Sequence, residues 1–495
     1  MQTLDDAPRP DDDSGLLRAL GRPEAIAIVV GNVIGSGIFL KPGGVAEQLH
    51  DFRLILLVWV VGGVLCVLGA LTLAELAAML PRAGGLYVYL REAYGRPVGF
   101  LFGWTEFLIR VRGSIAALSV AFVSKFAKAL DWQVSDGMQV LLVAILVGGL
   151  AWVNVMGVLW GGRLQLTTTI IKAVSLLLVG LAPLLLFTIA DSAPSTANYA
   201  TTVAPSQTSL AAQIGVVLLA VMWAYNGWHG ITPLAEEIKD PKRNFPRALF
   251  GGIAILIVLY LAANFAYHSV LSMEEMEFAK DDAPEHMLNK LIGPVGATIM
   301  AVIIMCSVFG AIATNLLNSP RISFAMGRDR VFFRSLGSVH QRFRTPVVAI
   351  IVTAVMAIGL VAAVAIGKHA VRDVNLDTIS WELGRRITES LQGKGMFNLL
   401  TNFVIFAASI FYLLAVLAVI VLRIRRPKAE RPYKTLGYPF VPLAFIVAYV
   451  WFLTQVYLSN PLESIMGLGL IAIGIPAYFV FARIRKQNVN EEQTQ

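Results

Sequence analysis

Long apolar runs alternate with short polar stretches along almost the whole chain. A run of about 20 mainly apolar residues is enough for a helix to cross the hydrocarbon core of a bilayer. The pattern therefore predicts an all-α membrane protein with twelve transmembrane helices. The predicted spans are residues 25–48, 54–79, 98–130, 137–159, 164–190, 209–235, 248–271, 294–326, 346–367, 396–424, 438–459 and 463–483.

The composition agrees with a membrane protein. The 495 residues are 57% hydrophobic and only 15% charged, whereas soluble domains contain about 25% charged residues. The net charge of +8 is assigned to cytoplasmic loops rather than to a nucleic-acid surface, because cytoplasmic loops carry an excess of Lys and Arg. We expect the lipid bilayer as a partner and no nucleic acid.

The basic residues also predict the orientation. Loops and termini on one side hold about 26 Lys and Arg, against about 8 on the other side, so the first side should be cytoplasmic. An even number of spans places both termini there. We predict a disordered cytoplasmic tail over 1–22, a transporter-like helical domain over 23–485 and a short cytoplasmic tail over 486–495.

Two of the predicted spans are interrupted at mid-depth. Residues 31–40, GNVIGSGIFL, place three glycines, an asparagine and a serine inside the first span. Each glycine inside a helix costs about 1 kcal/mol relative to alanine. Residues 222–237, MWAYNGWHGITPLAEE, interrupt the sixth span in the same way. Interrupted spans at matching positions of two halves indicate the binding site of a transporter.

The interruption of the first span has a chemical consequence. Backbone groups freed inside a membrane are tolerated only within protein or beside a water-filled cavity. The amides of residues 35–38 begin a half-helix, whose positive end suits a carboxylate, and Ser36 adds a hydroxyl. Freed carbonyls of the sixth span could accept from an ammonium group. Together they predict a site for an amino acid zwitterion.

The first interruption has two other possible interpretations. Gly31 and Gly35 form a GxxxG pattern, which could serve only for close packing between helices. The glycines could also begin a GxGxxG dinucleotide loop, but Leu40 replaces the last glycine and no strand precedes the motif. The matching interruption in the sixth span favours a binding site over both.

The motifs in their order resemble the amino acid–polyamine–organocation superfamily, and most of all its L-type amino acid transporter branch. That branch includes the light subunits of heteromeric amino acid transporters and their bacterial relatives. The resemblance covers about residues 20–485 and is carried by GNVIGSGIF, AELAAMLPRAGGLYVYLREAYG, YNGW with EEIKDPKRNFP, SPRISFAMGRD and RIRRPKAERPYK. It implies a LeuT-type fold with inverted repeats over about 25–190 and 209–424, broken helices 1 and 6, and two added helices over about 438–483.

The resemblance also implies roles for residues at the two interruptions. Ile34, Ser36 and Gly37 would receive the substrate carboxylate, and carbonyls around Trp223 and Ala224 would receive the α-amino group. Trp223 stands where relatives have an aromatic gate, usually phenylalanine. Asn226 lies near the side-chain pocket, where a neutral amide favours small or polar neutral amino acids over cations. The predicted substrate-binding residues are Ile34, Gly35, Ser36, Gly37, Ile38, Trp223, Ala224, Asn226 and Gly227.

Charged residues inside two predicted spans add further hypotheses. A lysine inside a membrane span indicates a functional site, because burying its charge is costly. The resemblance implies that Lys172 replaces a sodium ion and bridges spans 1, 5 and 8. The alternative is a lysine that extends to the membrane interface. Glu106 and Arg110 are four residues apart and can pair on one helix face, with Arg112 nearby. We expect a structural charge network, with selection of substrate charge as the alternative.

Together with these observations, the resemblance implies a sodium-independent exchanger of neutral L-amino acids that works by alternating access, and we expect no enzymatic activity, metal or cofactor. One alternative keeps the fold but makes it a proton-coupled symporter of cationic amino acids or polyamines. Another is a membrane sensor, for which the largest loop, 368–395, is too small an output domain. By the resemblance, a heavy-chain partner would be linked through a cysteine in the loop between spans 3 and 4, but that loop, ALDWQVSDG, has none. We therefore expect no disulfide-linked heavy chain and a solitary transporter in a bacterial inner membrane.

Overall fold

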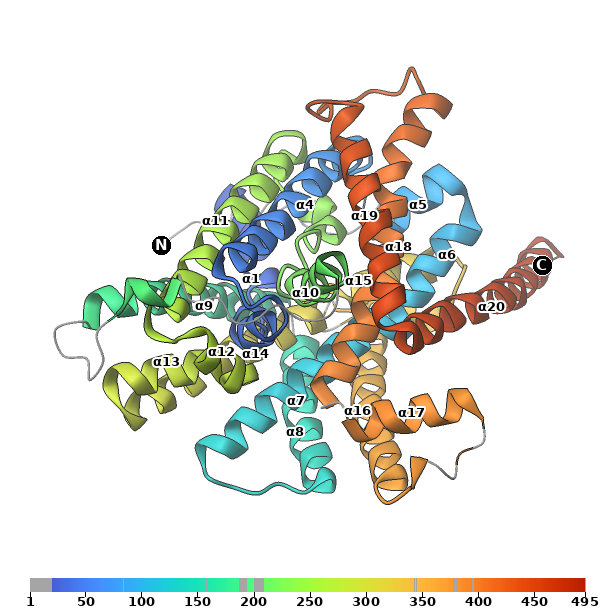
Figure 1. The fold of residues 1–495 in the computed structure, drawn as a ribbon. Helices are drawn as coiled ribbons and strands as arrows, with labels where there is room; N and C mark the ends of the chain where they lie inside the picture. The colour runs from blue at the N-terminus through green and yellow to red at the C-terminus, as the bar shows by residue number, and fades with distance from the viewer. Residues whose placement is uncertain are drawn as a thin grey trace, which may run out of the picture.

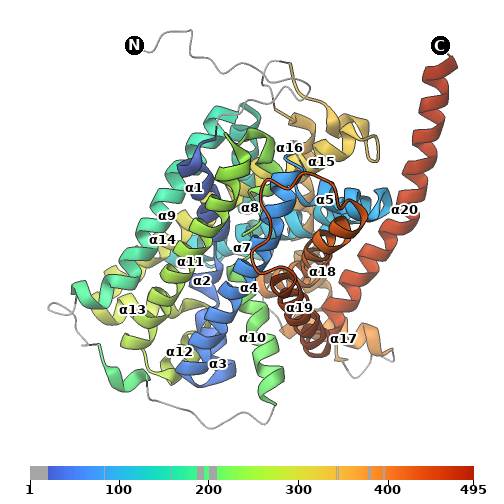
Figure 2. The same ribbon diagram turned by 90° about the horizontal axis from the view of Figure 1, so that it is seen from above.

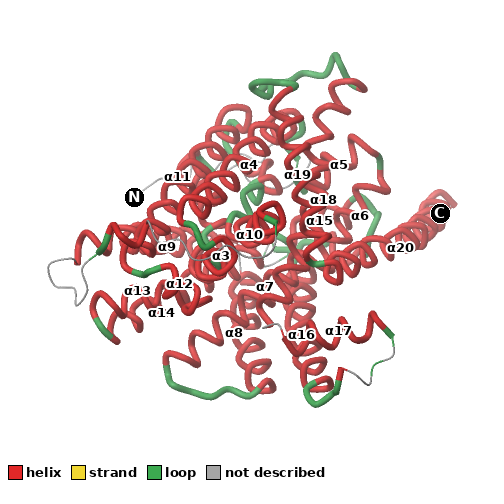
Figure 3. The backbone as a smooth tube through the Cα atoms, viewed as in Figure 1, coloured by secondary structure: helices red, strands yellow, loops and turns green. Residues whose placement is uncertain are grey.

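The computed structural model describes residues 20–494 except 83, 157, 187–193, 200–208, 342, 344, 377, 378, 380, 394 and 395. Helices make up most of this part of the chain and pack into one bundle (Figures 1 and 3). Eleven segments within it are long and apolar enough to cross a membrane. The predicted all-α membrane architecture is therefore confirmed, while most of the predicted N-terminal tail lies outside the described residues.

The long segments follow the predicted spans closely. They are built from α1 (Arg22–Val33) with α2 (Gly37–Leu40), α4 (Phe52–Met79), α6 (Arg96–Thr105) with η2 (Glu106–Arg110) and α7 (Val111–Ala129), α8 (Asp136–Met156), α9 (Val158–Leu186), α11 (Pro241–Val270), α14 (Pro294–Asn318) with α15 (Pro320–Arg328), α16 (Val347–Val371), α18 (Met396–Arg425), α19 (Phe440–Ser459) and α20 (Pro461–Thr494).

Shorter elements fill the connections. They are α3 (Pro42–Leu49), α5 (Leu86–Tyr94), η3 (Thr196–Tyr199), α10 (Leu210–Ala224), η4 (Thr232–Glu237), α12 (Met273–Ala279), η5 (Lys280–Asp282), α13 (Ala283–Ile292), η6 (Arg334–Gly337) and α17 (Glu382–Gly393). Among these, α10 corresponds to the predicted sixth span. Its 15 residues are too few to cross a membrane alone, because the helix ends at Ala224 and a run of turns follows.

Helix boundaries follow local sequence signals. Asp51 precedes α4, and its carboxylate accepts hydrogen bonds from the amides of Arg53 and Leu54 at 2.7 and 3.3 Å, which satisfies donors that have no partner inside the helix. Ser272 and Glu275 form a capping box at the start of α12. The last helix, α20, continues to Thr494, beyond the predicted end of its span.

The bundle has two ends that differ in composition. Figure 2 shows the end of α20 together with α5 and α15 at one end, which we call the N-terminal side because α1 also begins there. At the opposite side lie α3, α12, α13 and α17. The N-terminal side carries the basic loops, whereas the opposite side carries the short helices α12, α13 and α17.

A buried carboxylate ties together three segments at the N-terminal side. Glu75 of α4 is 1% exposed and accepts from both Nε and Nη2 of Arg423 at 2.9 and 2.6 Å. The amide and hydroxyl of Thr435 each donate to it at 2.8 Å, and Arg431 lies 3.3 Å away. One side chain thus joins α4, α18 and the loop after α18.

We expect Glu75→Ala to lower the stability of the folded protein. The substitution leaves the partners of the carboxylate without their acceptor, which costs about 1–3 kcal/mol. Thermal unfolding of the purified protein in detergent measures the change. Glu430 is the control, because its pair with Lys242 is exposed and such pairs contribute little. Equal unfolding temperatures for Glu75→Ala and Glu430→Ala would contradict the anchoring role.

Candidate functional site

The first span breaks where the glycine-rich motif lies. Helix α1 ends at Val33, and Ile34 is extended, with φ −67° and ψ 97°. Gly35 and Ser36 lead into α2, which begins at Gly37. Within the described backbone, no carbonyl accepts a hydrogen bond from the amides of residues 35–38, as is usual for the first donors of a helix. The break therefore presents four donors.

Side chains from three other helices lie beside the carbonyls of this break. Lys172 Nζ of α9 donates to the Gly31 carbonyl at 3.0 Å, and Ser307 of α14 donates to the Gly35 carbonyl at 3.0 Å. The hydroxyl of Tyr260 on α11 lies 3.2 Å from the Val33 carbonyl. Lys172 is only 1% exposed, so it does not extend to the interface. The predicted contact between spans 1 and 5 is present.

The second break lies beside the first. Helix α10 ends at Ala224, turns follow, and η4 begins at Thr232. The Trp223 carbonyl accepts from the Asn226 amide at 3.1 Å, and the Ala224 carbonyl accepts from Tyr260 at 2.9 Å. The two carbonyls predicted to receive an amino group thus already have protein partners, although a carbonyl oxygen has two lone pairs.

Two glycines allow the breaks to touch. A Cβ on Gly37 would lie 2.3 Å from the Ala224 Cα, so any side chain there would collide with the backbone of α10. Gly227 has φ +102°, and a Cβ there would lie 2.7 Å from the Asn32 carbonyl oxygen. Only glycine meets both requirements without strain.

A cavity lies at the meeting point of the two breaks. Its lining contains seven of the residues predicted from the sequence and six others. The predicted ones are Gly35, Ser36, Gly37, Arg110, Trp223, Asn226 and Gly227, and the others are Asn32, Val33, Ser114, Leu118, Ala311 and Asn315. Ile34, Ile38 and Ala224 do not line it, because they are buried in the packing behind it.

One wall of this cavity, Trp223, belongs to an aromatic pair with Phe397. The Trp223 indole nitrogen donates to the Ser36 hydroxyl at 3.2 Å, and the indole meets the Phe397 ring edge to face at 6.0 Å. The Lys41 ammonium lies 4.7 Å from the centre of that second ring. Tryptophan differs here from phenylalanine in a useful way, because only the indole can donate to Ser36. Sequence reasoning missed Phe397, which lies far along the chain.

The charged residues of the third span form a pair rather than a network of three. Arg110 Nε donates to the Glu106 carboxylate across a π-helical turn, so the predicted ion pair is present. Arg112 instead donates to the Thr353 hydroxyl at 2.9 Å and to the Glu106 carbonyl at 3.3 Å, with its guanidinium over the Phe107 ring. Arg112 lines neither this cavity nor the second cavity described next.

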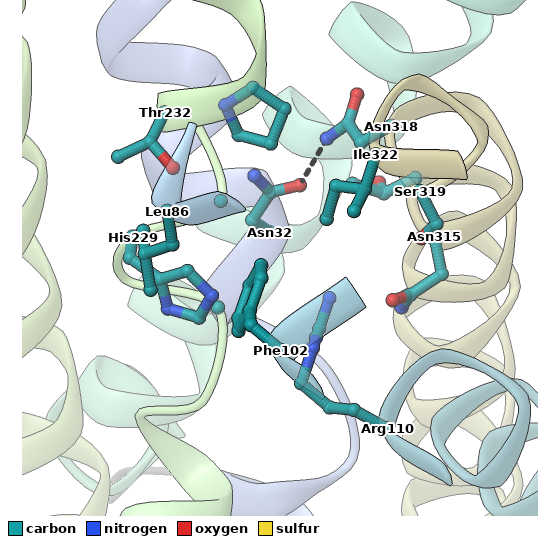
Figure 4. A pocket seen from close by; sticks show the side chains of 14 residues that line it. Asn32, Leu86, Phe102, Arg110, His229, Thr232, Asn315, Asn318, Ser319 and Ile322 are labelled. Atoms are coloured by element: carbon teal, nitrogen blue, oxygen red, sulfur yellow. Dashed lines mark hydrogen bonds between the residues drawn. The ribbon is translucent and has the colours of Figure 1, made fainter. Parts of the chain in front are cut away.

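A second cavity, which we call the vestibule, continues from the first toward the N-terminal side (Figure 4). Four residues line both: Asn32, Arg110, Gly227 and Asn315. The vestibule is also lined by Leu86, Phe102, His229, Gly230, Thr232, Pro233, Thr314, Asn318, Ser319 and Ile322. Asn318 donates to the Asn32 side-chain oxygen at 3.1 Å across it. Asn315 and Asn318 lie inside an apolar run of the sequence. Side-chain amides in such a run are the signal that could have predicted this vestibule.

Fold and site together define a class of protein. Two broken membrane helices meet at a small polar cavity, and this arrangement is typical of secondary transporters. The amino acid permease family matches residues 20–474. The chain therefore belongs to the amino acid permease family, which confirms the resemblance described above.

Relatives match over at least four fifths of their own length. The chain is 30% identical over 475 residues to the serine/threonine exchanger SteT of Bacillus subtilis (strain 168), which covers 94% of this chain and 98% of that protein. It is also 30% identical to the Asc-type amino acid transporter 1 of Mus musculus, over 94% of this chain and 81% of that protein. The large neutral amino acids transporter small subunit 2 of Mus musculus is 30% identical, over 96% and 84%.

We expect Gly37→Ala to abolish amino acid uptake, because its methyl group would push apart the backbones of the two breaks. Uptake of a labelled amino acid by membrane vesicles measures this effect. Gly44→Ala is the matched control, since a Cβ there meets nothing within 4 Å, and it should transport normally. Normal uptake by a folded Gly37→Ala variant would contradict the proposed contact.

Proposed function

We propose that this protein exchanges neutral L-amino acids across the plasma membrane by alternating access, without sodium. The observation that carries the proposal is the meeting of two broken helices at one polar cavity. One break offers the free amides of residues 35–38, and the other offers backbone carbonyls at the end of α10. An α-amino acid carries a carboxylate and an ammonium group on one carbon, so it can use both at once.

The side chain of the substrate would face a polar part of the cavity. Ser114, Asn226 and Asn315 line it, and the Ser114 hydroxyl has no partner among the described residues. A buried polar group without a partner costs free energy that a hydroxyl or amide of a ligand recovers. This supports small or polar neutral substrates, in keeping with the serine/threonine exchanger among the relatives.

The position of Lys172 supports sodium independence. Its ammonium binds the Gly31 carbonyl and lies against α14, where a Cβ on Gly310 would be 2.6 Å from the lysine Cε. The amino group of Lys172 thus lies at the junction of spans 1, 5 and 8. In its protonated form it would take the place of a sodium ion there.

The two breaks also support a LeuT-type arrangement of five plus five inverted helices with two added. They fall at matching places in the segments 25–190 and 209–424. By the positive-inside rule the basic N-terminal side is cytoplasmic. The Trp223–Phe397 pair would then close the cavity to the outside, with the vestibule on the cytoplasmic side. The two cysteines, Cys66 and Cys306, lie within α4 and α14, which favours a transporter without a disulfide-linked heavy chain.

Proton-coupled symport of cations is less favoured. Arg110 is the one charged side chain among the described residues lining either cavity, and it would repel a cationic side chain. The nearby carboxylate, Glu106, is already paired with that arginine. No carboxylate is therefore available at the cavity, within the described residues, to take up a proton or to bind a second ammonium group.

Counterflow in proteoliposomes tests the proposal. Labelled L-serine should enter vesicles loaded with unlabelled neutral amino acids and should not accumulate in empty ones. Rates should be equal in sodium and choline buffers and independent of a pH gradient. Accumulation in empty vesicles under a pH gradient would instead establish the symporter, and a sodium requirement would overturn the role assigned to Lys172.

Asn226→Asp should shift selectivity toward lysine and arginine. The Tyr412 hydroxyl donates to the Asn226 side-chain oxygen at 3.2 Å, and an aspartate keeps that acceptor while adding a negative charge beside the cavity. Competition of labelled serine uptake by unlabelled amino acids measures the shift, and Asn226→Ser is the neutral control. An unchanged competition profile in Asn226→Asp would show that this position does not face the substrate.

A further inference from the structure

Arg110 occupies an unusual place between the two cavities. Arg110 lines both cavities and is the one charged side chain in their described lining. It is nevertheless buried, with only 9% of its surface exposed. In Figure 4 its guanidinium extends into the vestibule between Phe102 and Asn315. The cavity at the breaks and the vestibule therefore share one fixed positive charge.

The Arg110 guanidinium has N–H donors that no described residue engages. Its Nε is engaged by the Glu106 carboxylate, while its two terminal nitrogens have no acceptor among the described residues. A guanidinium presents its donors in a planar fork that matches the two oxygens of a carboxylate. The open edge of Arg110 therefore has the geometry to bind a carboxylate from the vestibule.

The local charges are unbalanced. Glu106 contributes one negative charge, whereas Arg110 and Arg112 contribute two positive charges, and all three side chains are buried. An uncompensated charge away from water is costly, so an anion at the open edge would stabilise the cluster. The vestibule lining adds polar atoms without partners in the described chain, Asn32 Nδ2 and His229 Nδ1.

We infer that Arg110 forms a second, transient carboxylate site on the transport path. The substrate carboxylate passes from the amides of residues 35–38 to Arg110 and from there to the N-terminal side. The amino acid occupies the two sites in sequence, because Asn32, Gly227 and Asn315 belong to the walls of both cavities. This inference rests on the proposed function, since it takes the amino acid as the anion.

The test compares the two sides of the membrane. Exchange of labelled L-serine is measured in right-side-out and inside-out vesicles that contain the full-length protein, with saturating unlabelled serine on the other side. Arg110→Gln should raise the half-saturating concentration about 10-fold on the vestibule side, as expected for a lost charge-assisted hydrogen bond, and less than about 2-fold on the other side. Arg110→Lys, which keeps the charge but not the fork, should give a smaller sided shift.

Two further variants separate this role from a structural one. Glu106→Gln with Arg110→Gln removes both charges of the ion pair, so no unpaired carboxylate remains, and it should show the same sided shift. Arg112→Gln removes an equally buried arginine that lines neither cavity, and it should leave the ratio of the two half-saturating concentrations unchanged.

An equal shift on both sides in Arg110→Gln, no shift, or the same sided shift in Arg112→Gln would overturn the inference while leaving the exchange activity standing. If wild-type vesicles show no amino acid exchange, the proposed function itself fails, and the inference fails with it.

Discussion

The structure depends on one constraint: backbone groups that a broken helix frees inside a membrane must find partners without bulk water. At the first break the carbonyls of Gly31 and Gly35 accept from Lys172 and Ser307, while the one O–H of Tyr260 is shared between the Val33 and Ala224 carbonyls. The amides of residues 35–38 find no acceptor in the described backbone. The first break is thus asymmetric, since side chains donate to its carbonyls but its first amides have no described backbone acceptor.

The first break also touches the second one directly. Gly37 lets α2 touch the backbone of α10, and Tyr260 lies within hydrogen-bonding distance of a carbonyl from each break. The Trp223 indole donates to the Ser36 hydroxyl oxygen, which leaves the Ser36 O–H able to donate to a carboxylate at the same time.

The sequence predicted the all-helical membrane architecture and the two helix breaks well, because both depend on local patterns. Apolar runs located eleven of the spans, and the clustered glycines located both breaks. Contacts between distant segments were harder to foresee. Nothing in the sequence joins Trp223 to Phe397, or Asn32 to Asn318, because such pairings arise only when helices pack. The length of α10 was overestimated because its apolar character continues into the turns.

The sequence also predicted the Glu106–Arg110 pair from its spacing, but not the π-helical turn that carries it. Nor did it predict that Arg112 would turn toward Thr353 on α16. Residues two positions apart lie on different faces of a helix, and only the packing of the bundle decides which face meets a cavity. The packing of the helices therefore decides which of the charged side chains face a cavity, although all three residues lie within one short stretch of the sequence.

The central claim is that the free amides of the first break bind the substrate carboxylate. Its most direct test is counterflow of labelled L-serine into proteoliposomes loaded with L-serine, with its methyl ester or with the amino alcohol that lacks the carboxylate. The claim predicts exchange with internal L-serine and almost none with the other two compounds, which keep the amino group and the side chain. Equal exchange with all three would contradict it.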